Sequence, residues 1–197
     1  MEQFSRTVRL IGEGAFKKLS QSKIAVFGVG GVGSNAAMAL CRAGIGNFFL
    51  ADMDVVDVTN INRQSVARID TVGKDKVAVM KEDMLKINPD VNAKTCKAFL
   101  TRDNLEEFLP ESYDYVLDCI DNLTCKVFLA KLCYNKNIPL VSCMGAGNRI
   151  NAHFQVVDIF DTFNDPVAKV MRKGLKEQGV PALKTVWTSD LPLKSKD

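Results

Sequence analysis

The stretch that decides the fold is Ile24-Ala25-Val26-Phe27-Gly28-Val29-Gly30-Gly31-Val32-Gly33. Its first four residues form a continuous apolar run, which is typical of a buried strand in a parallel sheet. The glycines match G-x-G-x-x-G, and the small residues from Val32 to Ala43 predict a helix that ends at Gly44. Glycines at such a junction let the chain turn tightly and let a phosphate approach the helix N-terminus. The stretch therefore predicts a strand, a phosphate-binding loop and a helix.

Apolar runs and helical patterns alternate along most of the remaining chain. Predicted strands cover residues 47–51, 92–98, 113–119 and 140–144; predicted helices cover 73–87, 101–109 (capped by Thr101) and 122–134. The helix over 73–87 has Val77, Met80, Met84 and Ile87 on one face. A strand over 154–159 and a helix that opens at Asp165-Pro166 follow. This order predicts an α/β fold: a Rossmann-like, mostly parallel sheet with helices on both faces and a small C-terminal strand–helix extension.

Length and composition favour an ordinary globular protein. The 197 residues suffice for one domain, with 1–150 as a nucleotide-binding, Rossmann-like part and 151–197 as a C-terminal extension of it. No apolar stretch is long enough for a membrane helix, and the N-terminus lacks a signal-peptide pattern. None of the six cysteines forms a C-x-x-C pair, which argues against zinc and favours a reducing, cytoplasmic compartment. His153 is the only histidine, so a catalytic His triad is not expected.

A second group of polar residues indicates which nucleotide the loop would bind. Asp52 ends the second predicted strand, 19 positions after Gly33, where a carboxylate can accept hydrogen bonds from a ribose. NAD, FAD and ATP would all satisfy these features. Arg63 and Lys76 are expected to flank the crevice and Asp121 to end a strand beside it. Attack on an α-phosphate needs such cations and a carboxylate-held Mg²⁺, whereas hydride transfer does not. The residues favour ATP and Mg²⁺, unless the two cations are surface residues and Asp121 belongs to a helix cap.

The combined motifs resemble those of the adenylyltransferase family of ubiquitin-activating enzymes and their bacterial relatives. The shared motifs are G-x-G-G-x-G, the aspartate after the second strand, N-x-x-R-Q, T-V-G-x-x-K and D-x-x-D-N. The resemblance implies that Asp121 holds Mg²⁺, and that Arg6, or its competitor Arg9, reaches the partner's site in a homodimer. It also implies catalytic roles for Arg63, Lys76, Asp121 and Arg6. The nucleotide-binding residues would be Gly28, Gly30, Gly31, Gly33, Asp52, Asp54, Asn60, Arg63 and Lys76.

Later segments resemble the branch of this family that dehydrates threonylcarbamoyladenosine in tRNA. They are residues 6–13, 144–149, 165–173 and 186–190. This resemblance implies adenylation of the threonyl carboxylate by ATP, followed by ring closure with release of AMP and without an enzyme nucleophile. Two departures from the pattern stand out: Asn151 replaces an expected aspartate, and the chain ends earlier than members of this branch normally do.

The helix after Asp165 is predicted to be amphipathic. Val167, Val170, Met171 and Leu175 share one side, and the other side carries the basic residues Lys169, Arg172, Lys173 and Lys176. The basic face could follow tRNA phosphates or could simply be solvated. Three rival functions stay open: an adenylyltransferase that activates the C-terminus of a ubiquitin-like sulfur carrier, a NAD-dependent oxidoreductase, and a non-enzymatic nucleotide-bound scaffold.

Overall fold

The computed structural model describes residues 2–109, 113–150 and 152–194. The chain forms two compact units, and each is described here by itself. Unit 1 contains Met1–Leu100 and Tyr113–Cys119, and unit 2 contains Thr101–Ser112 and Ile120–Asp197. The division of the chain at residue 150 stays a prediction.

Unit 1 is built on four parallel strands. They are β1 (Lys23–Phe27), β2 (Asn47–Ala51), β3 (Asn92–Cys96) and β4 (Tyr115–Asp118), in the order β3-β2-β1-β4. Phe27 at the end of β1 pairs with Ala51 of β2 and Asp118 of β4, so three carboxyl ends meet at one edge. Residues 24–27 of β1 are at most 6% exposed, as the continuous apolar run predicted.

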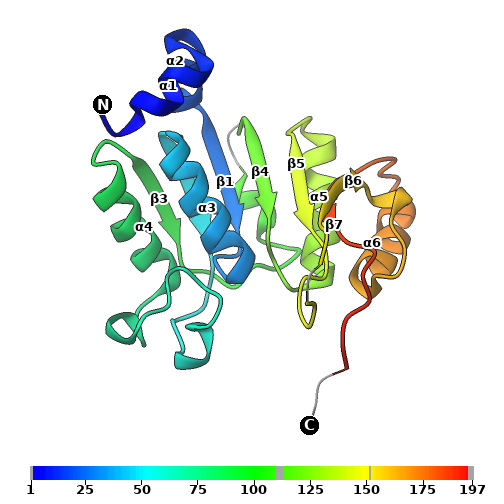
Figure 1. The fold of residues 1–197 in the computed structure, drawn as a ribbon. Coiled ribbons are helices and arrows are strands. Elements are labelled where there is room, and N and C mark those ends of the chain that lie inside the picture. The colour runs from blue at the N-terminus through cyan, green and yellow to red at the C-terminus, as the bar shows by residue number, and fades with distance from the viewer. Residues whose placement is uncertain (1, 110–112, 151, 195–197) are drawn as a thin grey trace. The chain divides into compact units, whose positions relative to one another are not determined.

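Helices α3 (Gly31–Ala43) and α4 (Lys76–Ile87) lie on the same face of this sheet (Figure 1). The predicted apolar face of α4 is confirmed, because Val77, Met80 and Met84 are buried in the core against the strands. Helices α1 (Ser5–Ile11) and α2 (Glu13–Gln21) precede β1 and were not predicted; a short 3-10 helix, η1 (Glu2–Phe4), comes before them. Phe4 and Phe16 hold this N-terminal segment together through a ring contact of 5.4 Å.

The connection from β2 to α4 lies at the carboxyl edge of the unit 1 strands (Figure 1). It contains two short 3-10 helices, η2 (Val58–Asn60) and η3 (Ile69–Thr71). Its two ends pair with each other, since the Val56 N–H donates to Lys74 O and the Gly73 N–H donates to Val56 O. Gly73 has a φ of 84° there, so α4 begins at Lys76 and the prediction that it begins at Gly73 was wrong.

Unit 2 contributes three strands, in the order β5-β7-β6. Strand β5 (Leu140–Cys143) runs parallel to β7 (Lys184–Trp187), and β6 (Gln155–Asp158) runs antiparallel to β7. Its helices are α5 (Leu123–Asn135), α6 (Pro166–Glu177) and the short 3-10 helices η4 (Leu105–Phe108) and η5 (Ile159–Asp161). No strand was predicted at β7, so the C-terminal extension has one more strand than expected.

Two local predictions in unit 2 were also wrong. Residues 101–109 contain only the short 3-10 helix η4 and no α-helix, although Thr101 and Asn104 exchange the two hydrogen bonds of a capping box just before it. Val170 is 47% exposed, whereas Ala168, Met171 and Leu175 form the buried side of α6. Among the described residues, no helix combines the length and apolar character that a membrane span requires.

Candidate nucleotide-binding site

The loop glycines of unit 1 fall into two pairs. Gly28 has a φ of 88°, and a Cβ on Gly33 would lie 1.8 Å from Gly28 O, so the fold itself requires glycine at both positions. A Cβ on Gly30 would meet only Gln64 Nε2 at 3.8 Å, and one on Gly31 would meet Arg63 Cγ at 3.4 Å. Neither contact excludes a side chain. Gly30 and Gly31 therefore leave open space at the N-terminus of α3, where a phosphate can bind.

The Asp52 carboxylate fixes this loop to the end of β2. Its Oδ2 accepts from the Val29 N–H at 2.6 Å, and its Oδ1 accepts from the Asp54 N–H at 2.8 Å. Each oxygen keeps a lone pair, so Asp52 can also accept from ribose hydroxyls. The structure thus places Asp52 against the glycine loop, as its position in the sequence suggested, and ribose binding stays a prediction.

Arg63 is held over the first turn of α3 by Asn35. The Asn35 Nδ2 donates to Gly31 O at 2.6 Å and to Arg63 O at 3.0 Å. Arg63 Nη1 donates to Thr59 O and to Asn62 Oδ1, which leaves its Nε and Nη2 hydrogens for a ligand. The arrangement brings a cation to the open side of Gly31, where it can contact a phosphate.

Asp54 and Lys76 form an ion pair of 2.8 Å. The Lys76 side chain is 5% exposed and the Asp54 side chain 49% exposed, so the buried lysine is paired with a carboxylate at the surface.

Asn60 is buried, and its Oδ1 accepts from the Asp57 N–H at 3.1 Å to close the turn of η2. Hydrogen bonds from the Thr59 hydroxyl and N–H lower the pKa of Asp57, which keeps this turn charged. The predicted contacts of Lys76, Asp54 and Asn60 with a nucleotide are not tested by these bonds and stay predictions.

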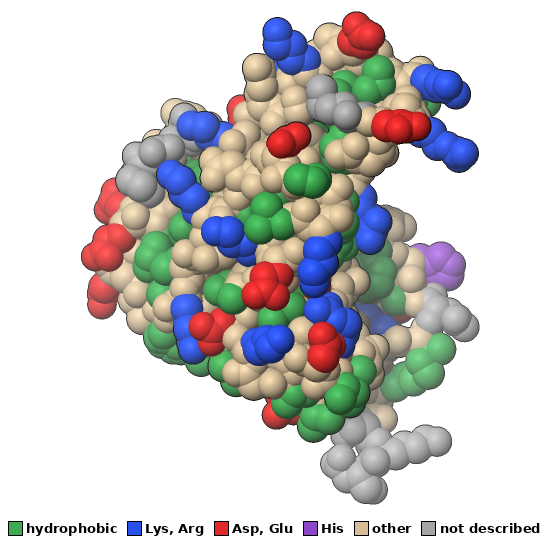
Figure 2. Space-filling model, turned by 90° about the vertical axis from the view of Figure 1, so that its left-hand side faces the viewer, with side chains coloured by type: hydrophobic (Ala, Val, Ile, Leu, Met, Phe, Trp, Pro, Cys, Tyr) green, Lys and Arg blue, Asp and Glu red, His purple; other side chains and the backbone are tan. Residues whose placement is uncertain are grey.

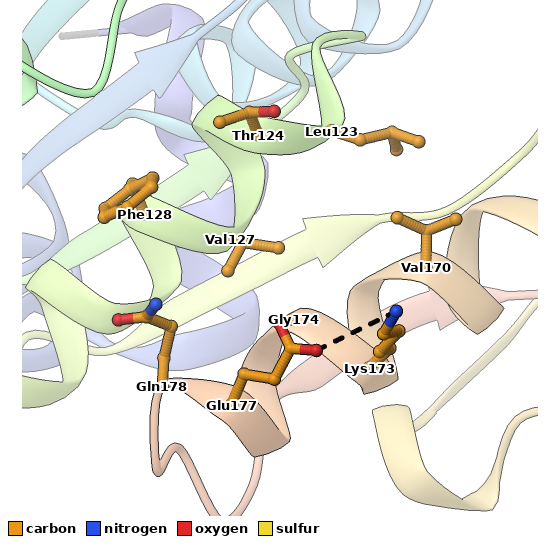
Figure 3. Close-up of a pocket in the computed structure, with 9 residues that line it drawn as sticks. All are labelled: Leu123, Thr124, Val127, Phe128, Val170, Lys173, Gly174, Glu177 and Gln178. Carbon is orange, nitrogen blue, oxygen red and sulfur yellow. Dashed lines mark ion pairs between the residues drawn. The ribbon is translucent and has the colours of Figure 1, made fainter.

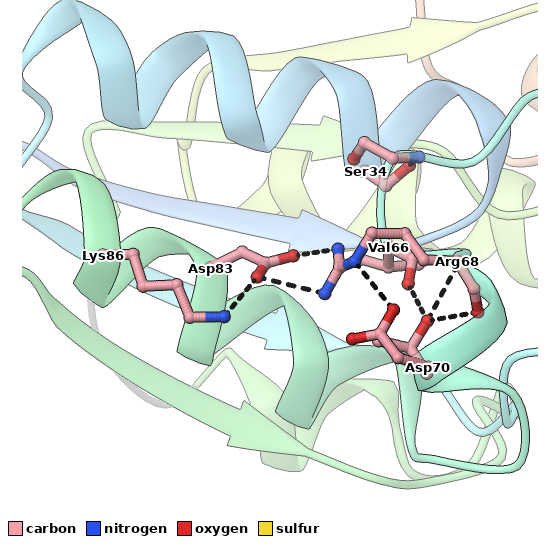
Figure 4. A network of polar contacts seen from close by, with 8 residues as sticks. Ser34, Val66, Arg68, Asp70, Asp83 and Lys86 are labelled. Carbon is pink, nitrogen blue, oxygen red and sulfur yellow. Dashed lines mark hydrogen bonds and ion pairs between the residues drawn. The ribbon is translucent and has the colours of Figure 1, made fainter.

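A polar network anchors the segment that carries Arg63 (Figure 4). The Ser65 N–H donates to Ser34 Oγ of α3 at 3.1 Å. Three positions on, Arg68 donates from both terminal nitrogens to Asp83 of α4, at 2.6 and 3.3 Å. The Asp83 hydrogen bond raises the pKa of Arg68, as expected for a paired guanidinium. Since α3 and α4 both hold the segment, Arg63 is positioned by the core of unit 1.

Asp121 belongs to unit 2 and lies just before Asn122, which caps α5 by accepting from the Cys125 N–H at 3.1 Å. Asp121 is exposed, and within the described residues its carboxylate has no hydrogen bond or ion pair. Asp121 itself therefore does not cap the helix. Its place relative to Arg63 and Lys76 stays a prediction.

Arg6 and Arg9 are both exposed on α1, so the structure does not decide which of them would reach a partner subunit.

The loops after β5 and β7 are tied down within unit 2. Asp165 caps α6, accepts from the Gly145 N–H at 3.1 Å and lies 3.5 Å from Arg149 Nη2. The pKa of Asp190 is lowered by hydrogen bonds from the His153 N–H and the Thr188 hydroxyl. His153 itself is exposed. Asn151, where an aspartate was expected, lies outside the described residues.

The basic side of α6 is only partly as predicted. Lys169, Lys173 and Lys176 are exposed, but Arg172 turns inward and donates to Thr162 O at 2.8 Å. A groove of about 270 Å³ lies between α5 and α6, and Lys173 forms an ion pair of 3.9 Å with Glu177 beside it. Figure 3 shows Val170 and Lys173 among the side chains that line this groove. Val170 lies on the same face of α6 as Gly174, four residues further along, and both line this groove together with Val127 of α5.

Charged side chains elsewhere are mixed in sign. On the face that Figure 2 shows, Lys and Arg side chains are interspersed with Asp and Glu side chains and with apolar ones. This face therefore offers no large patch of one sign to a polyanion. In the part of the chain that the structure describes, no group of three or more His, Cys, Asp and Glu side chains is arranged to hold a metal ion.

The fold and the glycine loop define an α/β nucleotide-binding protein of the Rossmann type, which confirms the predicted fold class. The family model described as ThiF family matches residues 4–182, and the chain belongs to this family. It is 42% identical to the tRNA threonylcarbamoyladenosine dehydratase of Bacillus subtilis (strain 168) over 195 residues, which are 98% of this chain and 77% of that protein.

Two solved structures of the Escherichia coli tRNA N6-threonylcarbamoyladenosine dehydratase are also similar. The complex with ATP matches with a TM-score of 0.93 and 38% identity, over 98% of this chain and 83% of that chain. The complex with AMP matches with a TM-score of 0.95 and 37% identity, over 100% of this chain and 83% of that chain. The resemblance inferred from the motifs is thus confirmed over nearly the whole chain.

Several residues that shape the site carry no signal of that role in the sequence. Asn35 and Ser34 position the segment around Arg63 from α3, but an asparagine and a serine inside a small-residue helix do not indicate long-range contacts. Arg68 and Asp83 are ordinary charged residues in the sequence. Gln64 is the last residue of the N-x-x-R-Q motif, but the resemblance implied roles only for Asn60 and Arg63 within it.

Proposed function

We propose that this protein dehydrates threonylcarbamoyladenosine in tRNA to its cyclic form at the expense of ATP. The observation that carries the proposal is the similarity to tRNA threonylcarbamoyladenosine dehydratases, which extends over 98% of the chain and includes unit 2. The open faces of Gly30 and Gly31 with Arg63 beside them support ATP as the nucleotide.

The reaction would proceed in two steps. A carboxylate oxygen of the threonyl group attacks the α-phosphorus of ATP, the bond to the leaving pyrophosphate breaks, and an acyl-adenylate forms. A nitrogen of the same substrate then attacks the activated carbonyl carbon, the bond from this carbon to the AMP oxygen breaks, and AMP leaves while the nitrogen loses its proton to water as the ring closes. The α3 N–H groups and Arg63 would stabilise the charge that develops on the phosphate in the first step. The second step needs no enzyme nucleophile, because both reacting groups belong to one substrate.

Mg²⁺ fits the residues that the proposal assigns to it. The exposed Asp121 carboxylate has no partner among the described residues, and a carboxylate is the ligand that Mg²⁺ prefers. When bound, the ion would neutralise charge on the triphosphate and the departing pyrophosphate. Lys76 would supply a second positive charge if the triphosphate displaces Asp54 from their ion pair.

The proposal also includes tRNA and a second copy of the chain as partners. Lys169, Lys173 and Lys176 would contact tRNA phosphates from the exposed side of α6. Arg6 or Arg9, exposed on α1, would reach the site of the partner subunit.

The test is to incubate the protein with ATP, Mg²⁺ and tRNA that carries threonylcarbamoyladenosine, and to measure loss of one water from the nucleoside by mass spectrometry. We expect the wild-type protein to form the cyclic product and Asp121→Asn to lose activity by about 100-fold or more while retaining nucleotide binding. Normal turnover by Asp121→Asn would contradict the proposal that Asp121 holds Mg²⁺. AMP formation that depends on a ubiquitin-like sulfur carrier, with no reaction on the tRNA, would contradict the proposed substrate.

A further inference from the structure

Gln64 is a buried side chain beside the glycine loop, and the mechanism above gives it no role. Only 7% of the residue is exposed. Its main chain is fixed in the connection, since its N–H donates to Asn60 O and its carbonyl accepts from the Ala67 N–H, both at 3.0 Å. Within the described residues its side-chain amide makes no hydrogen bond, and Oε1 is buried without a partner. The two hydrogens of Nε2 thus have no acceptor among the described residues, so a ligand that accepts a hydrogen bond is expected there.

The nitrogen of this amide faces the open side of the loop. Gln64 Nε2 lies 3.8 Å from the position that a Cβ on Gly30 would occupy, and that Cβ would meet nothing else within 4 Å. Gly30 is also the residue before the first turn of α3, a helix of 13 residues whose leading N–H groups attract anions. A neutral donor and a helix N-terminus therefore converge on the same unfilled space.

We propose that Gln64 is a substrate-binding residue whose Nε2 donates to the carboxylate that is being activated. This inference rests on the proposed function. In-line attack requires a carboxylate oxygen within about 3.5 Å of the α-phosphorus, so the residue that holds the carboxylate must adjoin the phosphate-binding loop. A lysine or arginine there would pair with the carboxylate and weaken it as a nucleophile. A neutral amide can orient the carboxylate without neutralising its charge.

The charged Arg63 and the neutral Gln64 would bind different groups of the reactants. Arg63 lies over Gly31 and is suited to the phosphate, which bears more negative charge as pyrophosphate departs. Gln64 lies over Gly30 and would hold the second carboxylate oxygen while the first attacks. Gln64 exchanges no proton in this step, and the electron pair of the broken bond leaves with pyrophosphate.

The experiment compares Gln64→Met with Ser65→Ala in the full chain. Ser65 is a matched control, because its Oγ is also buried without a partner in the structure as described, while its N–H holds Ser34. Three quantities are measured: kcat/KM for threonylcarbamoyl-modified tRNA at saturating ATP, the Kd for ATP, and the Tm. For Gln64→Met we expect kcat/KM to fall by about 10- to 100-fold, as when a hydrogen bond to a charged group is removed, with the Kd for ATP changed less than about threefold.

The Tm separates a functional role from a structural one. Both substitutions remove an unpaired buried polar group, so the Tm of each variant should stay unchanged or rise, while only Gln64→Met should lose activity. If Gln64→Met does not fold, Gln64→Asn keeps the amide but withdraws it by one methylene, and the same kinetic loss is expected.

Each other outcome overturns the inference. Unchanged kinetics with a lower Tm would show that the amide serves only the fold through a bound water. An equal loss of ATP affinity would assign Gln64 to the nucleotide. If the wild-type protein does not dehydrate the tRNA, the proposed function fails together with the inference; if it does so and Gln64→Met matches it, the inference alone fails.

Discussion

At the scale of single residues, Gly31 and Gly33 offer a direct way to separate ligand binding from folding. A methyl group on Gly33 would stand 1.8 Å from Gly28 O, so Gly33→Ala should destabilise unit 1 by about 1–3 kcal/mol or more through overpacking. A methyl group on Gly31 makes only ordinary contacts with Arg63, at 3.4 Å to its Cγ and 3.8 Å to its carbonyl oxygen, and fills the space proposed for phosphate. Gly31→Ala should therefore fold normally and lose ATP binding. Thermal unfolding with and without ATP measures both effects.

The two glycine variants control for each other. Wild-type protein should gain Tm on addition of ATP, because a ligand that binds only the native state stabilises it. Gly31→Ala should start from the wild-type Tm and gain nothing, whereas Gly33→Ala should start lower. A normal ATP-dependent rise in Gly31→Ala would mean that the phosphates do not lie over Gly31.

Residue-scale contacts also mark how far the sequence predicts the site. The position of Asp52 beside the glycine loop was predictable, because it follows from strand periodicity and from the spacing between β2 and that loop. The support of Arg63 by Asn35 and of Arg68 by Asp83 was not predictable, since each interaction joins residues from different elements that only the folded core brings together.

At the scale of elements, the errors in prediction have physical causes. Strand β7 has four residues, of which Lys184 and Thr185 break the apolar run, and it exists because β5 and β6 both pair with it. The apolar face of α6 was assigned from period alone, which favoured Val170. The buried side is formed by Ala168, Met171 and Leu175, whereas Val170 lines the groove between α5 and α6 and stays 47% exposed, because that groove is left unfilled beside it.

The basic side of α6 leads to a prediction for tRNA binding. Lys169 and Lys173 are exposed, so a Lys169→Ala and Lys173→Ala double variant should weaken tRNA binding and reduce the slope of log K against log salt by roughly one for each phosphate that a lysine no longer neutralises. Arg172 is the matched control, because its guanidinium is bonded to Thr162. Arg172→Ala should cost about 1–2 kcal/mol of stability and leave the slope unchanged. An unchanged slope in the double variant would exclude α6 from the tRNA interface.

At the scale of the whole molecule, the alternation of strands and helices predicted the α/β class because it depends on chain order alone. Two properties of the whole molecule do not follow from that order. One is the place of Asp121 in unit 2 relative to Arg63 in unit 1, and the other is the association of two chains. Both depend on contacts between residues that are far apart in the sequence or belong to different chains, and the order of elements along one chain does not encode such contacts.

Subunit mixing tests whether an arginine of α1 acts across a dimer. We expect Arg6→Ala and Arg63→Ala each to be nearly inactive alone, since both would remove positive charge from the phosphate site. In a heterodimer of the two, the subunit with Arg63 intact would receive Arg6 from its partner. Random mixing makes half of the dimers mixed with one complete site each, so about a quarter of wild-type activity should return. If Arg6 acts within its own subunit, mixing restores nothing. Repeating the experiment with Arg9→Ala in place of Arg6→Ala shows which of the two exposed arginines reaches the partner.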